Sequence, residues 1–353
     1  MKRVALILFL VAFSPAFVSA KTLTAGTGVV MRNTGTQAIV LGYDNGSLEI
    51  RSWSGALIAS RSGLGRITAL ENYRSRGSVQ PKIFVGSAEN GGTLRLIDPV
   101  ALSTDVTKRV GLGTITSLWA WQRWIYVGAK STSGVGTIYR LDNLNFGTLA
   151  SRTGLGEIKA INDADTGTTK DIVIASLDGS GTVRQLLFDS LAIRSYRNGQ
   201  GAIYGLDTGD MNNDGKDEIA IASTAGGGCV KMLYNTTLAT AGQITGIGAP
   251  SCMAMGHVGI AQSDDAGNGK FSIAVGTSGG VMRNYAVTTA TGAFSLIGQR
   301  TALGVVNQAG IWGAYGTDVD QVVFMNSVGG KIEFHIASET LTDMTKFSVT
   351  PLP

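Results

Sequence analysis

The sequence predicts an all-β protein, a seven-bladed β-propeller built from four-stranded antiparallel blades. Two observations predict this fold. First, one short pattern occurs seven times in the 353 residues: an apolar strand, a turn, a glycine, and a second strand that opens on a small or polar residue. Second, the pattern returns about every 47 residues with several strands per unit, a spacing typical of propellers.

We name the strands of a blade A to D, from the inside of the ring outward, so that the repeated strands are B and C. The predicted B strands are Ala38–Gly42, Lys82–Gly86, Trp124–Gly128, Asp171–Ala175, Glu218–Ala222, Ser272–Gly276 and Gln321–Met325. The glycines are Gly46, Gly92, Gly136, Gly181, Gly228, Gly280 and Gly330. Each glycine fits the positive-φ position of a hairpin between B and C.

A second repeat predicts strand A. Its copies are Leu64–Ile67, Leu112–Ile115, Leu155–Ile158, Gly201–Ile203 and Leu303–Val306, with weaker copies at Gly28–Val30 and Ile247–Ala249. The glycines in these copies fit the crowded inner end of a blade, where backbones approach closely.

Strand D is the least regular, as expected for an outer edge. Its candidates are Leu57–Arg61, Val106–Arg109, Leu149–Arg152, Ile193–Arg197 and Leu296–Arg300. The sequence leaves the closure of the ring open. Residues 22–28 align with residues 59–65 and could form the outer strand of the last blade, while Lys346–Thr350 compete for the same place.

Residues 1–20 have the pattern of an export leader. Lys2 and Arg3 precede the apolar run Val4–Phe13, and Val18-Ser19-Ala20 supply small residues for cleavage. The run is shorter than the ~20 residues that span a bilayer. We therefore expect residues 21–353 to form one propeller that is secreted, periplasmic or held at the cell surface, with no integral membrane segment after cleavage.

The net charge is small once the predicted leader is removed. Without Lys2 and Arg3 the formal charge falls from +4 to +2, which gives no reason to expect nucleic acid. The only cysteines, Cys229 and Cys252, would meet an oxidising compartment. They fall on strands of neighbouring blades, so a disulfide is predicted; the alternative is two buried free thiols. With only two histidines, a zinc site is not expected.

One segment carries chemistry, the run Gly209–Ala222 with the pattern D-x-N-x-D-G followed by acids and an apolar strand. It resembles the FG-GAP or VCBS repeat of integrin-α-like propellers. In that family the loop between strands A and B wraps a structural calcium ion. The resemblance implies side-chain ligands from Asp210, Asn212, Asp214 and Glu218 and a carbonyl ligand from Lys216, in a loop that we assign to the fourth blade.

The physics of calcium agrees, because this ion takes 6–8 oxygen ligands and glycine allows the tight turn. Two positions depart from the family pattern. Glu218 replaces the usual aspartate, and Asp217 stands where proline is frequent. The alternative is an acidic turn closed by its own Asx hydrogen bonds.

Five arginines fall four residues before a strand-A glycine or its equivalent: Arg61, Arg109, Arg152, Arg197 and Arg300. On one hypothesis they form a basic face that holds a polyanion such as an acidic polysaccharide. On the other, each arginine clamps a carboxylate or carbonyl of the next blade.

Trp119, Trp121 and Trp124 form the densest aromatic patch, at the predicted A–B turn of the third blade. They are a candidate glycan or protein contact, because tryptophan offers an apolar ring with a polar edge. The alternative is that they fill the space left by a short loop.

No catalytic set assembles in the sequence, and His257 and His335 are interpreted as structural. We expect a non-enzymatic binding or scaffold module, of adhesion type, whose partner is an extracellular protein or a polysaccharide. The alternatives are a carbohydrate-active enzyme of lyase or lactonase type and a structural subunit of a cell-surface assembly. Function depends on sites placed on the fold, so the fold does not choose among them.

Overall fold

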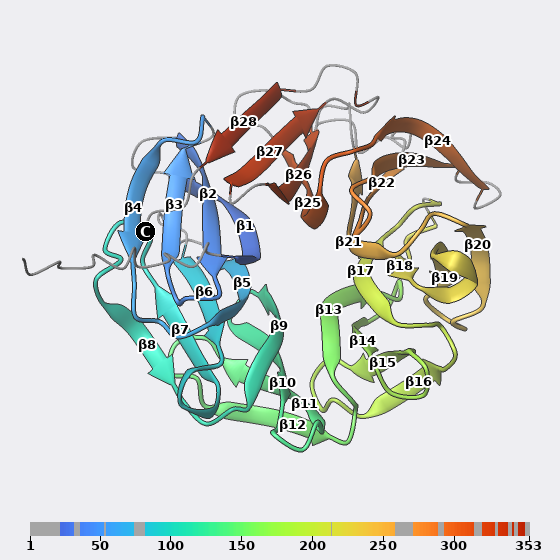
Figure 1. Ribbon diagram of the computed structural model, residues 1–353. Helices are drawn as coiled ribbons and strands as arrows, with labels where there is room; N and C mark the ends of the chain where they lie inside the picture. Colours follow the sequence, from blue (N-terminus) through green and yellow to red (C-terminus); the bar gives the residue numbers. More distant parts are fainter. Residues whose placement is uncertain are drawn as a thin grey trace, which may run out of the picture.

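Seven four-stranded antiparallel sheets stand in a ring, each built from four consecutive strands (Figure 1). The computed structural model describes residues 22–31, 36–52, 54–73, 82–212, 214–257, 271–288, 293–313, 320–328, 331–337, 341 and 345–349. The predicted leader, residues 1–20, lies outside these residues. The predicted seven-bladed propeller is confirmed.

The strands of each blade run from A inside to D outside. Blade one has β1 (Leu23–Met31), β2 (Thr36–Tyr43), β3 (Leu48–Ser52) and β4 (Leu57–Arg61). Blade two has β5 (Ile67–Tyr73), β6 (Lys82–Ser87), β7 (Thr93–Ile97) and β8 (Asp105–Arg109), with the short 3₁₀ turn η1 (Glu89–Gly91). Blade three has β9 (Thr114–Trp121), β10 (Trp124–Lys130), β11 (Gly136–Asp142) and β12 (Thr148–Thr153). Blade four has β13 (Ile158–Asp165), β14 (Lys170–Ser176), β15 (Thr182–Leu187) and β16 (Ile193–Arg197).

The remaining blades follow the same order. Blade five has β17 (Ile203–Gly209), β18 (Glu218–Ser223), β19 (Cys229–Tyr234) and β20 (Thr240–Thr245), with η2 (Ala225–Gly227). Blade six has β21 (Pro250–His257), β22 (Phe271–Thr277), β23 (Met282–Thr288) and β24 (Ala293–Arg300). Blade seven has β25 (Val305–Gly313), β26 (Asp320–Val328), β27 (Lys331–Ala337) and β28 (Thr345–Val349).

The leucine–glycine repeat does not start strand A as predicted. Gly65 lies in the turn between strands D and A, and β5 begins two residues later at Ile67. This turn glycine packs against the hairpin glycine of the preceding blade, and Leu64 donates its N–H to the Gly46 carbonyl over 3.1 Å. Equivalent hydrogen bonds to Gly92, Gly136, Gly181, Gly228 and Gly280 link the successive blades. The two glycine repeats are therefore the two halves of one inter-blade contact.

The apolar core lies between blades. Val40 and Ile50 of blade one pack with Ile67, Ile83 and Val85 of blade two, and all five are fully buried. Each such side chain stabilises the fold by roughly 1.5–3 kcal/mol. Side chains of a strand point alternately to the two faces of a blade, so each blade contributes side chains to the apolar layers on both sides of it.

The C-terminal strand closes the last blade. β28 pairs with β27 as its outer strand, whereas β1 pairs with β2 as the inner strand of blade one. An outer-strand role for residues 22–28 is therefore wrong. The physical reason is burial: Leu23 packs with Ile39, Met325 and Ile332 in a cluster shared by blades one and seven.

Every inner strand carries a β-bulge near its start. The pairing of strand A with strand B skips one residue in each blade: Thr24, Thr68, Thr116, Lys159, Tyr204, Ser251 and Asn307. A bulge bends the strand and leaves its extra residue outside the ladder. In the part of the chain that is described, no helix has the length and apolar character needed to cross a membrane.

Candidate functional site

The acidic loop joins β17 to β18, which are strands A and B, as predicted. It belongs to blade five rather than blade four. Its B strand, β18, is the fifth B strand in chain order, after β2, β6, β10 and β14.

The loop is closed by its own side chains. The Asp210 carboxylate accepts the Asp214 N–H over 3.0 Å and the Gly215 N–H over 2.8 Å. Asn212 Oδ1 also accepts the Asp214 N–H, and Asp214 Oδ1 accepts the Lys216 N–H, both over 2.9 Å. These are Asx turns, which curl the backbone around the carboxylates.

Glu218 anchors the loop from inside. Its side chain is buried and accepts the Met211 N–H and the Asn212 Nδ2–H, each over 3.0 Å. Burial raises the pKa of Glu218 to about 7, and the negative charges of Asp214 and Asp210 act in the same direction. The loop thus holds three carboxylates with no basic side chain hydrogen-bonded to them among the described residues.

The donors fit calcium in chemistry, since they are all hard oxygens. Among the described residues, however, no group of three or more His, Cys, Asp or Glu side chains is placed to hold a metal ion. The Asn212 amide nitrogen lies between the carboxylates, 3.0 Å from Glu218 Oε1 and 3.4 Å from Asp214 Oδ2. A calcium-bound loop requires this amide to leave that position.

Asp217 has a structural explanation that the sequence did not supply. Its carboxylate accepts the Asp165 N–H over 2.5 Å, and its own N–H donates to the Asp165 carbonyl over 2.9 Å. Asp165 ends strand A of blade four. The residue that departs from the family pattern therefore ties the acidic loop to the neighbouring blade.

The repeated arginines hold neighbouring blades together at the rim of the ring. Each donates to a backbone carbonyl in the turn between strands C and D of the next blade. The pairs are Arg61 with Leu102, Arg109 with Phe146, Arg152 with Leu191, Arg197 with Leu238 and Arg300 with Leu341, over 2.6–3.4 Å. Arg61 also pairs with Asp105 at 2.8 Å. This geometry is the predicted clamp; it does not gather the five guanidinium groups into a basic face.

A second set of basic residues escaped the sequence reasoning. Arg95, Arg184 and Arg283 lie on strand C and donate to the turn carbonyls of Leu64, Leu155 and Ile247. Lys231 occupies the same position and donates to Gln200 Oε1. Their signal was present, because each is the third residue after a hairpin glycine.

The predicted tryptophan patch is an inter-blade joint. Trp121 and Trp124 stack with centroids 5.6 Å apart, and Phe188 of blade four stands edge-on to both at 5.4 and 5.5 Å. Trp119 meets the same phenylalanine at 6.5 Å. Trp119 and Trp121 therefore face the same side of the strand, since both contact Phe188.

Cations of the chain cover this stack. The Arg140 guanidinium lies 4.7 Å from the Trp124 ring centroid and pairs with Asp189 at 2.7 Å. The Lys170 ammonium lies 5.7 Å from the Trp121 ring and pairs with Asp163 at 2.5 Å. Such contacts use the ring faces on which a sugar would stack, so the geometry favours the space-filling interpretation.

The predicted disulfide is wrong: both cysteines are free and buried. Cys229 Sγ lies 3.2 Å from Ser223 Oγ within blade five. Cys252 packs in a cluster with Val306 and Phe324 of blade seven. The two thiols therefore lie in different surroundings. The face of a blade to which a side chain points depends on its register in the strand, so strands of neighbouring blades need not bring their cysteines together. Burial raises the pKa of Cys252 to about 12, which suppresses the reactive thiolate.

The histidines stay apart. His257 ends β21 in blade six, and His335 lies in β27 of blade seven. His335 is buried 3.6 Å from Glu333, and burial lowers its pKa. The two are on different blades and belong to no common cluster of described residues.

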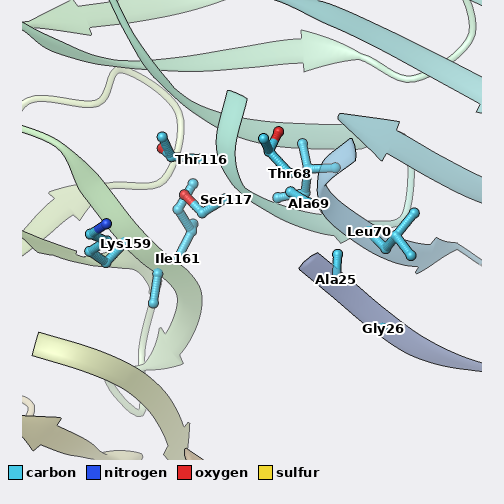
Figure 2. A pocket seen from close by; sticks show the side chains of 11 residues that line it. Ala25, Gly26, Thr68, Ala69, Leu70, Thr116, Ser117, Lys159 and Ile161 are labelled. Atoms are coloured by element: carbon cyan, nitrogen blue, oxygen red, sulfur yellow. The ribbon is translucent and has the colours of Figure 1, made fainter. Parts of the chain in front are cut away.

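A cavity of about 210 Å³ lies at the inner strands of blades one to four. Figure 2 shows Thr68, Thr116, Ser117 and Lys159 around it, with the small Ala25 on the near strand. The sequence reasoning missed this cavity. Its signal is the run of small and hydroxyl side chains on successive inner strands.

Two enclosed carboxyls lie on inner strands outside this lining. Burial raises the pKa of Glu71 to about 8, with the charge of Asp207 adding to the effect. Burial also raises the pKa of Asp207 to about 6, although Asp207 accepts the Met255 N–H over 2.8 Å and the Asn162 Nδ2–H over 2.6 Å. Both side chains keep partial contact with water.

No protein-family model matches the sequence, and no curated protein matches it. Solved structures share its fold. Sqt1 of Saccharomyces cerevisiae is 12% identical with a TM-score of 0.65, over 94% of this chain and 86% of that one. BBS1N, solved in complex with ARL6DN, is 14% identical with a TM-score of 0.64, over 94% and 93%. The WD40 propeller domain of Doa1 is 11% identical with a TM-score of 0.60, over 94% and 93%. At these identities the likeness shows the fold alone.

Proposed function

We propose that this chain is an exported, non-enzymatic propeller that acts as a binding or scaffold module, with a structural calcium ion in the loop of residues 210–218. One observation carries the proposal. The loop gathers three carboxylates and an amide oxygen between strands A and B of blade five, and no basic side chain is hydrogen-bonded to these carboxylates among the described residues. The FG-GAP or VCBS resemblance of the loop supports the same conclusion, and the leader pattern supports export.

Calcium would relieve an electrostatic cost in this loop. Glu218 is buried beside Asp210 and Asp214, and these negative charges oppose its ionisation. A divalent cation held by Asp210, Asn212, Asp214 and Glu218, with the Lys216 carbonyl, offsets that repulsion. The ion would brace a loop that Asp217 already ties to blade four, so its role is structural.

The first experiment measures the melting temperature of the exported chain in EDTA and in millimolar calcium. We expect calcium to raise it by several degrees, because a ligand that binds only the folded state stabilises that state. Asp214→Ala should abolish the rise. Asp189→Ala is the matched control, since Asp189 is an exposed carboxylate outside the loop. An equal response of wild type and Asp214→Ala contradicts the calcium site.

The second experiment separates binding from catalysis. The chain is tested on acidic and neutral polysaccharides by affinity electrophoresis, and the same samples are assayed for new reducing and unsaturated ends. Retarded migration without cleavage supports a binding module. Cleavage identifies a carbohydrate-active enzyme and overturns the non-enzymatic part of the proposal.

A further inference from the structure

The cavity inside the ring is built from the bulges of successive blades. Thr68, Thr116 and Lys159 are the extra residues of the inner strands in blades two, three and four, and all three line the cavity (Figure 2). The same structural position therefore supplies two hydroxyls and one ammonium to a single space. Ser117, the neighbour of Thr116, adds a third hydroxyl.

The hydroxyls offer acceptors rather than donors to this space. Thr68 donates to the Gly86 carbonyl and Thr116 to the Gly128 carbonyl, each over 3.2 Å. Ser117 donates to the Ile158 carbonyl over 3.5 Å. A hydroxyl has one proton and two lone pairs, so each oxygen keeps acceptor capacity. A ligand must bring the hydrogen-bond donors.

Of the described residues that line the cavity, Lys159 alone carries a charge. Its ammonium lies 2.5 Å from Glu157 Oε1, and the other oxygen of Glu157 is held by Lys130 at 2.6 Å. One carboxylate thus serves two ammonium groups, and among the described residues no second carboxylate pairs with Lys130 or Lys159. An anionic group in the cavity would complete the pairing.

The volume limits the size of the ligand. About 210 Å³ corresponds to about seven waters at ~30 Å³ each, and it is below the ~300 Å³ at which ordinary ligand pockets begin. We propose that the cavity binds a polyhydroxylated carboxylate of monosaccharide size, a sugar acid, with its carboxylate on Lys159 and its hydroxyls donating to Thr68 and Thr116. This inference rests on the proposed binding function and names the class of ligand.

Isothermal titration of the chain with sodium glucuronate and with glucose tests the inference, because the two sugars differ only at C6, where glucuronate has a carboxylate and glucose has a hydroxymethyl group. We expect glucuronate to bind at least about tenfold more tightly than glucose, as charge-assisted hydrogen bonds are the strong ones. Lys159→Gln should remove that preference. Thr116→Val, which keeps the shape of the side chain, should weaken glucuronate binding by about fivefold. Lys108→Gln, on the exposed outer strand β8, is the matched control.

Two results overturn the inference: no glucuronate binding by the wild type, or an equal affinity in Lys159→Gln. If Lys159→Gln fails to fold, Thr116→Val still tests the same cavity, because it removes a lining hydroxyl without changing any charge. A uronate-terminated oligosaccharide distinguishes a free sugar acid from the end of a polysaccharide chain, and binding of either supports the inference. Failure here together with calcium stabilisation and polysaccharide retention leaves the proposed function intact.

Discussion

A methyl group on Gly136 would stand 1.3 Å from the carbonyl oxygen of Gly156, the glycine of the turn that leads into the next blade. The same approach occurs between Gly92 and Gly113 at 1.6 Å. No side chain fits at these positions, so backbone meets backbone wherever a hairpin of one blade touches the turn into the following blade.

Gly136→Ala should therefore destabilise the propeller by more than about 2 kcal/mol, because the clash is with backbone that cannot turn away. Gly134→Ala in the same hairpin is the matched control. Gly134 has φ +84° with open space around it, so alanine there costs only about 1 kcal/mol of backbone strain. Denaturant unfolding of both variants checks the difference. Equal losses would contradict the contact.

The opposite sign is expected at Ala302. It takes φ +60° in the turn into blade seven, where the equivalent residues in other blades are glycines such as Gly154 and Gly246. Ala302→Gly should stabilise the chain by about 0.5–1 kcal/mol. An L-residue in this region costs roughly 1–2 kcal/mol of backbone strain, and the larger conformational entropy that glycine loses on folding offsets part of the gain. A lower unfolding midpoint in the variant would show that the turn is not strained.

The rim arginines give a test that separates clamp from recognition. Changing Arg109, Arg152 and Arg197 together to glutamine removes three inter-blade hydrogen bonds. These join blade two to three, blade three to four, and blade four to five. We expect a loss on the order of 3 kcal/mol, about 1 kcal/mol per hydrogen-bonded site, and unchanged retention on a polyanion column. Arg123→Gln is the control, because its side chain is 70% exposed. A variant with normal stability and lost polyanion retention would restore the basic-face hypothesis.

Particular residues show what a single sequence can predict here. The spacing of Gly46 and its equivalents was enough to predict seven blades, because a hairpin glycine can be recognised from the two strands that flank it. Their partners at Gly65 and its equivalents were found, but their contact was not, since it joins residues about 20 apart across two blades. The disulfide failed for a related reason: the direction of Cys252 depends on a bulge at Ser251 that shifts the register by one.

The candidate site was predicted in part. The loop of residues 210–218 lies between strands A and B, as the motif required, and its Asx hydrogen bonds follow from residue type alone. The cavity was not predicted, because it arises from four inner strands that meet only in the closed ring. Short motifs can be recognised in a sequence, whereas a site assembled from residues of several blades is visible only in the folded structure.

Because both cysteine thiols are buried, we expect them to react slowly with thiol reagents. Cys229 is fully buried and Cys252 is 7% exposed, and burial holds the pKa of Cys252 near 12. The folded chain should react with a thiol reagent only at its unfolding rate, and both thiols should titrate in denaturant without a reductant. Its intact mass should match two free thiols. A mass lower by two hydrogens would restore the disulfide.

Glu71 should make stability fall as the pH rises. Its pKa is raised in the folded state from 4.5 to about 8, so folding favours the protonated acid. The associated stability is full below about pH 4.5 and is lost as the pH rises to about 8. Above pH 8 the free energy of unfolding of Glu71→Gln should be higher than that of the wild type by on the order of 1–2 kcal/mol, and in acid the two should be equal. The difference is smaller than the full pKa shift implies, because water screens part of it.

Glu89→Gln is the control, and its stability should depend on pH with the opposite sign. The hydrogen bond from Arg95 lowers the pKa of Glu89, so its contribution is present above pH 4.5 and is lost as the pH falls. Urea unfolding across this range measures both variants, and a pH-independent difference for Glu71→Gln would show that its carboxyl is solvated.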